Sequence, residues 1–302
     1  MAGFQPTPIV VPTDLSSAAV AAVQTARHVA KSDEDVIVVY VGLDHELVAP
    51  ADVWGMGEIA QENTEDRRRF LKNWVAKNQL GDVRQEVRSG DPGLEICKLA
   101  TEQSSPLIVI PSHGRKGLSR LLLGSVAERV IRHAGCSVLV VRRHEDSEPE
   151  EGAWLPRKRV IVPVDLSEST ELAIETALQL VADPQHLGIV NAVYTISDTL
   201  VAGSIAVSQD DVAQNRRECL LRYLESHGWS DLNTHILFGE PGMAIAEYAD
   251  EKNADLIVMP SHGFHGLNRL LLGSTTERVL RHSKAPILVL RRFDAEPRAD
   301  ES

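Results

Sequence analysis

A stretch of fifteen residues in the middle of the chain recurs almost unchanged near its end. Residues 111–125 read PSHGRKGLSRLLLGS and residues 260–274 read PSHGFHGLNRLLLGS, with 12 of 15 positions identical. Upstream, GDPG at 90–93 recurs as GEPG at 239–242, at the same spacing of 149 residues. A period of that length is too long for a solenoid and has the size of a whole domain. The chain of 302 residues is therefore predicted to contain two copies of one domain.

The two copies are separated and followed by polar, acidic segments. Residues 144–152 read HEDSEPEEG, and a similar acidic tail fills 294–302. Such a composition lacks the apolar periodicity that would let a segment pack against a core. We therefore expect domain 1 over residues 1–143, an acidic linker over 144–157, domain 2 over 158–293 and the tail after it.

Within each copy, short apolar runs rich in β-branched residues alternate with longer amphipathic stretches. This alternation is typical of βαβ units on a parallel sheet, and runs that are apolar at every position suit strands buried on both faces. The expected strands are Ile9–Pro12, Val36–Val41, Val83–Val87, Leu107–Ile110 and Val138–Val141, then Val160–Pro163, Ile189–Val193, Thr234–Leu237, Leu256–Met259 and Ile287–Leu290. Right-handed crossovers then predict two tandem α/β domains, each a doubly wound, Rossmann-like five-stranded parallel sheet of strand order 3-2-1-4-5.

The fifth expected strand of each domain lies at a sheet edge and is apolar throughout. Val138–Val141 reads VLVV and Ile287–Leu290 reads ILVL. A bare apolar edge invites aggregation. We therefore expect the two halves to pair with each other through these fifth strands, as a pseudo-twofold pair. The sequence leaves open whether two chains associate further into a homo-oligomer.

Composition narrows the range of partners. The chain has 31 Lys and Arg against 43 Asp and Glu, a formal net charge of −12 that repels phosphate backbones and anionic lipid surfaces. No apolar run approaches the ~18 residues of a membrane span. Its three cysteines are scattered and form no C-x-x-C pair, so neither a disulfide framework nor a thiolate metal site is indicated. We expect a cytoplasmic protein without nucleic-acid, membrane or protein-bound metal partners.

The candidate binding site lies where open parallel sheets bind ligands, beyond the carboxyl ends of the strands at the reversal of strand order. In this topology the reversal falls between the first and fourth strands, where Pro12-Thr13-Asp14 and Pro163-Val164-Asp165 arrive. After each fourth strand, Gly124-Ser125 and Gly273-Ser274 precede an amphipathic helix, and free N–H groups at a helix start attract an anion. Simple capping by the aspartates and serines is the competing interpretation.

These motifs together resemble the universal stress protein family in its tandem two-domain form. The resemblance rests on VPTDLS at 11–16, GDPG at 90–93 and the SHG-to-LLLGS stretch at 112–125, and it extends over 8–142 and 159–292. It implies the fold described above and pairing through the fifth strands. In one branch of the family it also implies ATP binding by a motif of Gly, two residues, Gly, nine residues, Gly, then Ser or Thr.

Carried onto this chain, the resemblance implies a nucleotide site in each half. The implied residues are Pro12, Thr13, Asp14, Val41, Gly114, Gly124 and Ser125, and Pro163, Val164, Asp165, Ala192, Gly263, Gly273 and Ser274. The adenine and ribose contacts fall on Asp14 and Val41, with Asp165 and Ala192 as their counterparts. ATP is the implied ligand, with Mg²⁺ bound through its phosphates.

The chain departs from that motif at its first glycine, where Pro111 and Pro260 stand. Proline has a fixed φ and no N–H, so it offers no amide to a phosphate. Loss of one amide contact costs on the order of 1–3 kcal/mol, which weakens a multi-contact site without abolishing it. We therefore expect weaker ATP binding than the complete motif would give.

Catalytic motifs are absent from the sequence. It contains no Walker motif, no G-x-S-x-G nucleophile elbow, no H-E-x-x-H and no paired carboxylates at the expected loop ends. His113 and His262 stand beside the second glycine without an adjacent carboxylate partner, so a hydrogen bond that anchors the loop is favoured over catalysis. We expect no catalytic residue, and a nucleotidyl-transferring enzyme is the disfavoured alternative because it would need a base and a metal site.

Two functions remain in competition at this point. The resemblance implies a cytosolic stress-response protein, a non-catalytic regulatory module with an ATP site in each half. The alternative is a nucleotide-free stress scaffold that acts through protein-protein contacts.

Two basic segments receive different interpretations. Arg67-Arg68-Arg69 follows Glu62 and Glu65 on an expected helix, which predicts a solvated, salt-bridged face. Arg115-Lys116 in domain 1 is replaced by Phe264-His265 in domain 2. If these basic side chains touch a triphosphate, domain 1 should bind it more tightly.

Overall fold

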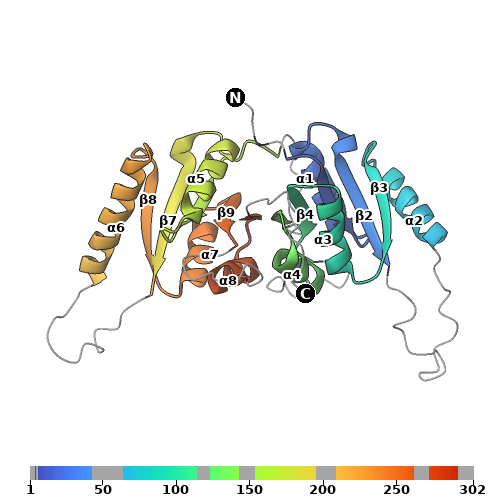
Figure 1. Cartoon of the computed structure of the whole chain (residues 1–302). Helices are drawn as coiled ribbons and strands as arrows, with labels where there is room; N and C mark the ends of the chain where they lie inside the picture. Colours follow the sequence, from blue (N-terminus) through green and yellow to red (C-terminus); the bar gives the residue numbers. More distant parts are fainter. Residues whose placement is uncertain are drawn as a thin grey trace, which may run out of the picture. The chain divides into compact units, whose positions relative to one another are not determined.

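The computed structural model describes residues 4, 6–42, 64–113, 123–142, 154–194, 209–261 and 272–291 (Figure 1). Its contacts divide the chain into two compact units, one built from the first half and one from the second. We refer to them as domain 1 and domain 2. The boundaries assigned to the linker and the tail stay predictions, as does the pairing of the fifth strands.

Domain 1 is a five-stranded parallel sheet in the order β3-β2-β1-β4-β5. Its strands are β1 (Ile9–Thr13), β2 (Val36–Gly42), β3 (Arg84–Ser89), β4 (Leu107–Pro111) and β5 (Ser137–Val141). Its helices are α1 (Ser17–Val29), α2 (Thr64–Lys77), α3 (Pro92–Glu102) and α4 (Ser125–His133), with a short 3-10 turn, η1 (Asp33–Asp35), before β2.

Domain 2 repeats this architecture in the order β8-β7-β6-β9-β10. Its strands are β6 (Val160–Pro163), β7 (Leu187–Val193), β8 (Asn233–Phe238), β9 (Leu256–Pro260) and β10 (Ile287–Leu290). Its helices are α5 (Ser169–Leu180), α6 (Gln209–Ser226), α7 (Pro241–Glu251) and α8 (Ser274–His282), with η4 (Pro184–His186) before β7. All ten expected strands and the 3-2-1-4-5 order of each domain are confirmed.

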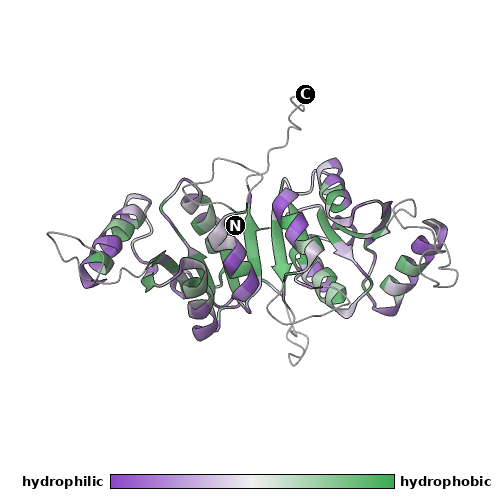
Figure 2. Ribbon diagram, turned by 90° about the horizontal axis from the view of Figure 1, so that it is seen from below, coloured by the Kyte–Doolittle hydropathy of each residue, from purple (hydrophilic) through white to green (hydrophobic). Residues whose placement is uncertain are grey.

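The core of each domain lies on the two faces of its central strands. Every residue of β1 and β6 is buried, and Figure 2 shows these sheets as the most hydrophobic part of the fold. Helix α1 turns Ala22, Val23 and Ala26 toward the sheet, at the three- and four-residue spacing of one helix face. Ser16 caps this helix by accepting from the Ala19 amide at 3.4 Å, a role for which serine is well suited.

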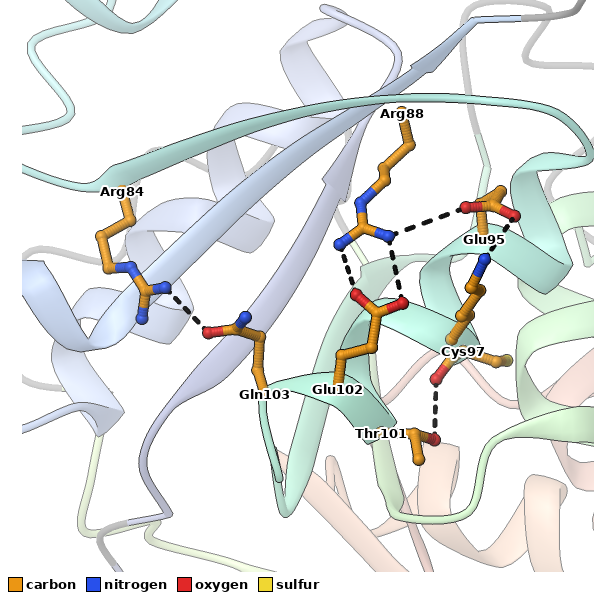
Figure 3. Close-up of polar contacts among 8 residues, drawn as sticks. Arg84, Arg88, Glu95, Cys97, Thr101, Glu102 and Gln103 are labelled. Atoms are coloured by element: carbon orange, nitrogen blue, oxygen red, sulfur yellow. Dashed lines mark hydrogen bonds and ion pairs between the residues drawn. The ribbon is translucent and has the colours of Figure 1, made fainter. Parts of the chain in front are cut away.

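The edge strand β3 is polar, which suits an edge that must not pair with other chains. Its Arg88 bonds Glu102 of α3 at 2.6 Å and lies 3.9 Å from Glu95 (Figure 3). Arg84 donates to the Gln103 side chain at 2.8 Å (Figure 3). Two arginines of β3 are therefore tied to α3 and to the residue that ends it.

The repeated GDPG motif of domain 1 forms the start of α3. Gly90 has φ +129°, a conformation that other residues rarely adopt. Asp91 caps the helix by accepting from the Leu94 amide at 3.0 Å, and Pro92 occupies the first turn. A side chain at Gly93 would overlap with Arg129 of α4, which also pairs with Asp91. The motif is therefore explained by helix capping and by the close packing of α3 on α4.

Domain 2 builds the same contact from its GEPG motif. Glu240 caps α7 by accepting from the Met243 amide at 2.9 Å and pairs with Arg278 of α8 at 2.7 Å. Burial opposes ionisation of this carboxyl. The amides of Met243 and Gly242 and the Arg278 guanidinium together outweigh that effect and hold the pKa of Glu240 below its usual value.

This contact predicts a pH-dependent effect of Glu240→Gln. A carboxyl whose pKa is lower in the folded state stabilises the fold above its unfolded pKa, and that contribution is lost as the pH falls through the folded pKa. We expect the substitution to lower the free energy of unfolding by ~1 kcal/mol at pH 7. The difference should fade below about pH 4. Urea denaturation at pH 7 and pH 3 measures both values.

Glu247→Gln provides the control, because Glu247 is exposed on the same helix. It should leave the free energy of unfolding unchanged at either pH. A loss for Glu240→Gln that is the same at both pH values would contradict the assigned role of the carboxylate.

Candidate functional site

Strands β1 and β4 part toward their carboxyl ends. β1 pairs with β4 through Ile9 and Val10 alone, whereas it pairs with β2 along its whole length to Thr13. On its other side β4 stays paired with β5 to its end, and the Ser112 amide continues this ladder by donating to the Val141 carbonyl at 3.0 Å. The sheet of domain 1 therefore opens on one side of β4, at the reversal of strand order.

Domain 2 opens at the same place. β6 pairs with β9 through Val160 and Ile161, whereas β9 stays paired with β10 to its end. Beyond that end, the Ser261 amide donates to the Leu290 carbonyl at 3.1 Å. We call these two places, between β1 and β4 and between β6 and β9, the switch-point openings.

One side of each opening carries an aspartate in a tight turn. Asp14 accepts from the Ser16 amide at 3.0 Å, and Asp165 accepts from the Ser167 amide at 3.0 Å. In each turn a leucine separates the aspartate from the serine. Leu15 has φ +66° and Leu166 has φ +63°, an unusual conformation for a leucine. The capping interpretation of these aspartates is therefore wrong, because the carboxylate closes a turn that precedes the helix. Each aspartate is held at the end of β1 or β6.

The opposite side of each opening is the start of α4 or α8. The Gly124 amide donates to the Ser112 carbonyl at 2.8 Å, and the Gly273 amide donates to the Ser261 carbonyl at 3.0 Å. These bonds fix the helix start against the end of β4 or β9. The N-cap residues are Gly124 and Gly273, without a side-chain cap.

Ser125 and Ser274 are the first helical residues and are exposed. The competing interpretation that they cap the helices is wrong, because Gly124 and Gly273 occupy the N-cap positions. Their hydroxyls lie instead at the end of the helix where free N–H groups and a partial positive charge favour an anion.

Close packing against the backbone of Ser112, rather than an unusual φ, favours glycine at position 124. Its φ of −64° is open to any residue. A Cβ at this position would lie 3.2 Å from the Ser112 carbonyl oxygen, closer than ordinary contact. The loop before α4 therefore packs tightly on the end of β4, and this packing by itself accounts for the glycine.

The remaining implied residues fall along the same edge or outside the described residues. Val41 and Ala192 are half-buried near the carboxyl ends of β2 and β7, one strand away from Asp14 and Asp165. The end of β1 or β6 carries Pro12 and Thr13, and Pro163 and Val164. Gly114, Gly263 and the two basic or aromatic pairs, 115–116 and 264–265, lie outside the described residues.

The two domains differ chemically at the end of this central strand. Thr13 accepts from the Leu15 amide through its hydroxyl at 2.9 Å. Domain 2 has Val164 there, and its carbonyl accepts from the Asn191 side chain at 2.8 Å. Asn191 is buried, and sequence reasoning missed it because its role depends on a contact between neighbouring strands.

His113 follows β4 and bonds the side chain of its neighbour, so its expected role in anchoring the loop stays a prediction. Its Nδ1 lies 2.9 Å from the Ser112 hydroxyl, and Nε2 is buried without a hydrogen-bond partner among the described residues. Burial, and to a lesser degree the charge of Arg142, lower the pKa of His113. The imidazole is therefore neutral at pH 7.

Arg67 departs from the expectation of a solvated face. Its side chain is 5% exposed, Nη1 donates to the Ser89 hydroxyl at 2.8 Å, and the guanidinium lies so close to Gly42 that any side chain there would overlap with it. Arg69 does form the expected surface ion pair, with Asp66 at 2.7 Å. The glycine at the end of β2 makes room for Arg67, a signal that only the tertiary structure reveals.

Neither a cluster of metal-binding side chains nor a membrane-spanning helix is found among the described residues. No group of three or more His, Cys, Asp or Glu side chains in this part of the chain is arranged to hold a metal ion. None of the described helices combines the length and apolar composition that crossing a bilayer requires.

Comparison with known proteins agrees with this architecture. A profile of the universal stress protein family matches residues 6–142 and 156–291, so the chain belongs to the universal stress protein family. A universal stress protein of Mycobacterium tuberculosis is 27% identical over 254 residues, which cover 80% of each chain. Another, from Mycolicibacterium smegmatis, is 26% identical over 302 residues, covering 94% of this chain and 96% of the relative.

Among solved structures, a universal stress protein from Archaeoglobus fulgidus has the same fold. The comparison gives a TM-score of 0.61 at 24% identity and covers 97% of this chain and 99% of the other. The two tandem domains of this chain are thus an arrangement that other members of the family share.

The Arg67 contact predicts that Gly42→Ala destabilises domain 1. The added methyl group would overlap with the guanidinium, and forced repacking of this kind costs on the order of 1–3 kcal/mol. Gly188→Ala is the matched control, since a Cβ on that strand glycine would have no neighbour closer than 3.9 Å. In urea denaturation, Gly42→Ala should lower the free energy of unfolding less in a chain that already carries Arg67→Ala than in the unmodified chain. Equal losses in both backgrounds would disprove the contact.

The burial of His113 predicts a titration midpoint below about 6.5 in the folded protein. Because folding favours the neutral imidazole, its contribution to stability is present above that pH and is lost as the pH falls. Proton NMR can follow the ring signal, assigned through His113→Gln, in the folded chain and in urea. A folded midpoint at or above the value in urea would refute the buried, neutral state.

Proposed function

We propose that each domain binds an adenine nucleotide at its switch-point opening and that the chain is a cytoplasmic, non-catalytic regulatory module of the stress response. The observation that carries this proposal is the convergence of two features at one opening, twice in one chain. An aspartate turn follows β1 or β6, and a glycine-fronted helix start follows β4 or β9. The first suits the nucleoside, and the second suits its phosphates.

In this proposal the phosphates bind at the start of α4 and α8. Ser125 and Ser274 would donate their hydroxyls, and the amides of the first helical turn would donate alongside them. Mg²⁺ would be carried by the phosphates and not by a protein cage. Asp14 and Val41, with Asp165 and Ala192, would contact the adenine and the ribose.

The non-catalytic part of the proposal is supported by the environment of His113. A general base needs a partner that orients it and holds its charge, usually a carboxylate. Among the described residues, the His113 ring instead bonds the Ser112 hydroxyl, and burial disfavours its protonated form. Such a histidine is suited to shaping a loop, and nucleotide binding would act through conformation and partner choice.

One observation favours the second candidate, a nucleotide-free scaffold that acts through protein contacts. Gly124 is fully accounted for by its packing against the Ser112 carbonyl, so this glycine alone does not require a phosphate. The scaffold would keep the same loop as a purely structural turn.

Nucleotide extraction and thermal unfolding separate the two candidates. We expect adenine nucleotide to be released when the purified chain is denatured. We also expect Mg-ATP to raise the melting temperature, because a ligand that binds the folded state at 100 times its Kd adds ~2.7 kcal/mol to the free energy of unfolding. An unchanged melting temperature at millimolar ATP would favour the scaffold.

The two sites can be told apart with matched variants. Gly124→Val and Gly273→Val each place a branched side chain in the loop before one helix. We expect the larger loss of ATP affinity from Gly124→Val, because domain 1 carries Arg115-Lys116 where domain 2 carries Phe264-His265. Calorimetric titration measures each affinity, and melting without nucleotide confirms that the variants fold. Equal losses would count against the asymmetry.

A further inference from the structure

The carboxyl ends of β2 and β7 occupy equivalent places but are covered differently. In domain 1 the strand ends at Gly42, which is buried beneath the Arg67 guanidinium. In domain 2 the strand ends at Val193, which is half-buried. Arg216 lies four residues before the buried Leu220, as Arg67 lies before Leu71, yet Arg216 is exposed. Among the described residues, Arg216 therefore does not cover the end of β7 in the way that Arg67 covers the end of β2.

Domain 2 places an exposed aromatic ring directly after β7. Tyr194 directly follows β7 and is 65% exposed, the most exposed of the large apolar side chains among the described residues. If the alternation of side chains along β7 continues to position 194, Tyr194 lies on the same side as Ala192, which is half-buried. The aligned position of domain 1 is Leu43, which has no ring.

The direction in which a nucleotide would extend follows from the pairing of the strands. Its phosphates would lie at the start of α8, beyond β9. The side toward β10 is closed by the bond from the Ser261 amide to the Leu290 carbonyl, and the opening lies toward β6. From β9 across β6 to β7 is two strand spacings, about 10 Å. An extended nucleoside triphosphate spans this distance, so its base would reach the end of β7.

We propose that Tyr194 is the base-stacking residue of the nucleotide site in domain 2. This inference rests on the proposed function and adds a contact that is specific to this half of the chain. The ring would stack on the base, whereas the phenol hydroxyl would not be required. Because every base has a π-face, the contact would add affinity with little choice among bases.

The test uses the full chain and calorimetric titration with Mg-ATP and, separately, with inorganic tripolyphosphate, which has no base. Tyr194→Leu gives domain 2 the residue that domain 1 carries at this position. We expect it to weaken ATP binding at one of two sites by about 5- to 100-fold and to leave tripolyphosphate binding unchanged. Tyr194→Phe should bind ATP like the unmodified chain. Phe70→Leu, a ring-to-leucine change at an exposed position of α2, is the matched control and should have no effect.

Each other outcome overturns the inference, and the outcomes are distinguishable. If the unmodified chain binds no ATP, the proposed function fails and the stacking contact fails with it. If that chain binds ATP and Tyr194→Leu leaves every site unchanged, the stacking contact alone is wrong. If Tyr194→Leu weakens ATP and tripolyphosphate equally, the ring supports the shape of the site and does not touch the base.

Discussion

The parting of β1 from β4, and of β6 from β9, is the constraint on which the rest of the molecule depends. Sheets whose central strands are buried on both faces offer few places where backbone and polar side chains can meet a ligand. Each sheet opens on one side of its fourth strand and stays closed on the other. The bonds from the Gly124 and Gly273 amides then hold a helix start over that opening. The aspartate turns and the helix starts owe their positions to this geometry.

Duplication preserved this framework while the chemistry around it diverged. Both domains keep a leucine with positive φ after the first strand, Leu15 or Leu166. Both also keep a carboxylate that caps the third helix. They differ in what lines the strand ends. Domain 1 has a threonine hydroxyl and a buried guanidinium there, whereas domain 2 has an asparagine amide and an exposed tyrosine. The two openings are therefore equivalent in backbone and different in the side chains at the neighbouring strand ends.

Local patterns in the sequence predicted the strands and, with the handedness of the crossovers, their order, because the apolar runs and the stretches between them depend on neighbours within a few positions. Burial of Arg67 was not predictable in that way. It requires a glycine on a distant strand and a hydroxyl at the end of β3, which come together only in the fold. Whether Ser125 caps α4 was left open for the same reason, since the N-cap position falls on Gly124, whose amide bonds the distant Ser112 carbonyl. For the candidate site, the sequence indicated the edge of the sheet at which the strands part but not the individual contacts there.

The most direct test of the central claim is a crystal structure of the full chain grown with Mg-ATP. The account predicts nucleotide density within a switch-point opening, with the phosphates at the start of α4 or α8 and the nucleoside beside Asp14 or Asp165. Nucleotide bound elsewhere, or a structure in which the aspartate and the glycine face opposite sides of the sheet, would contradict it.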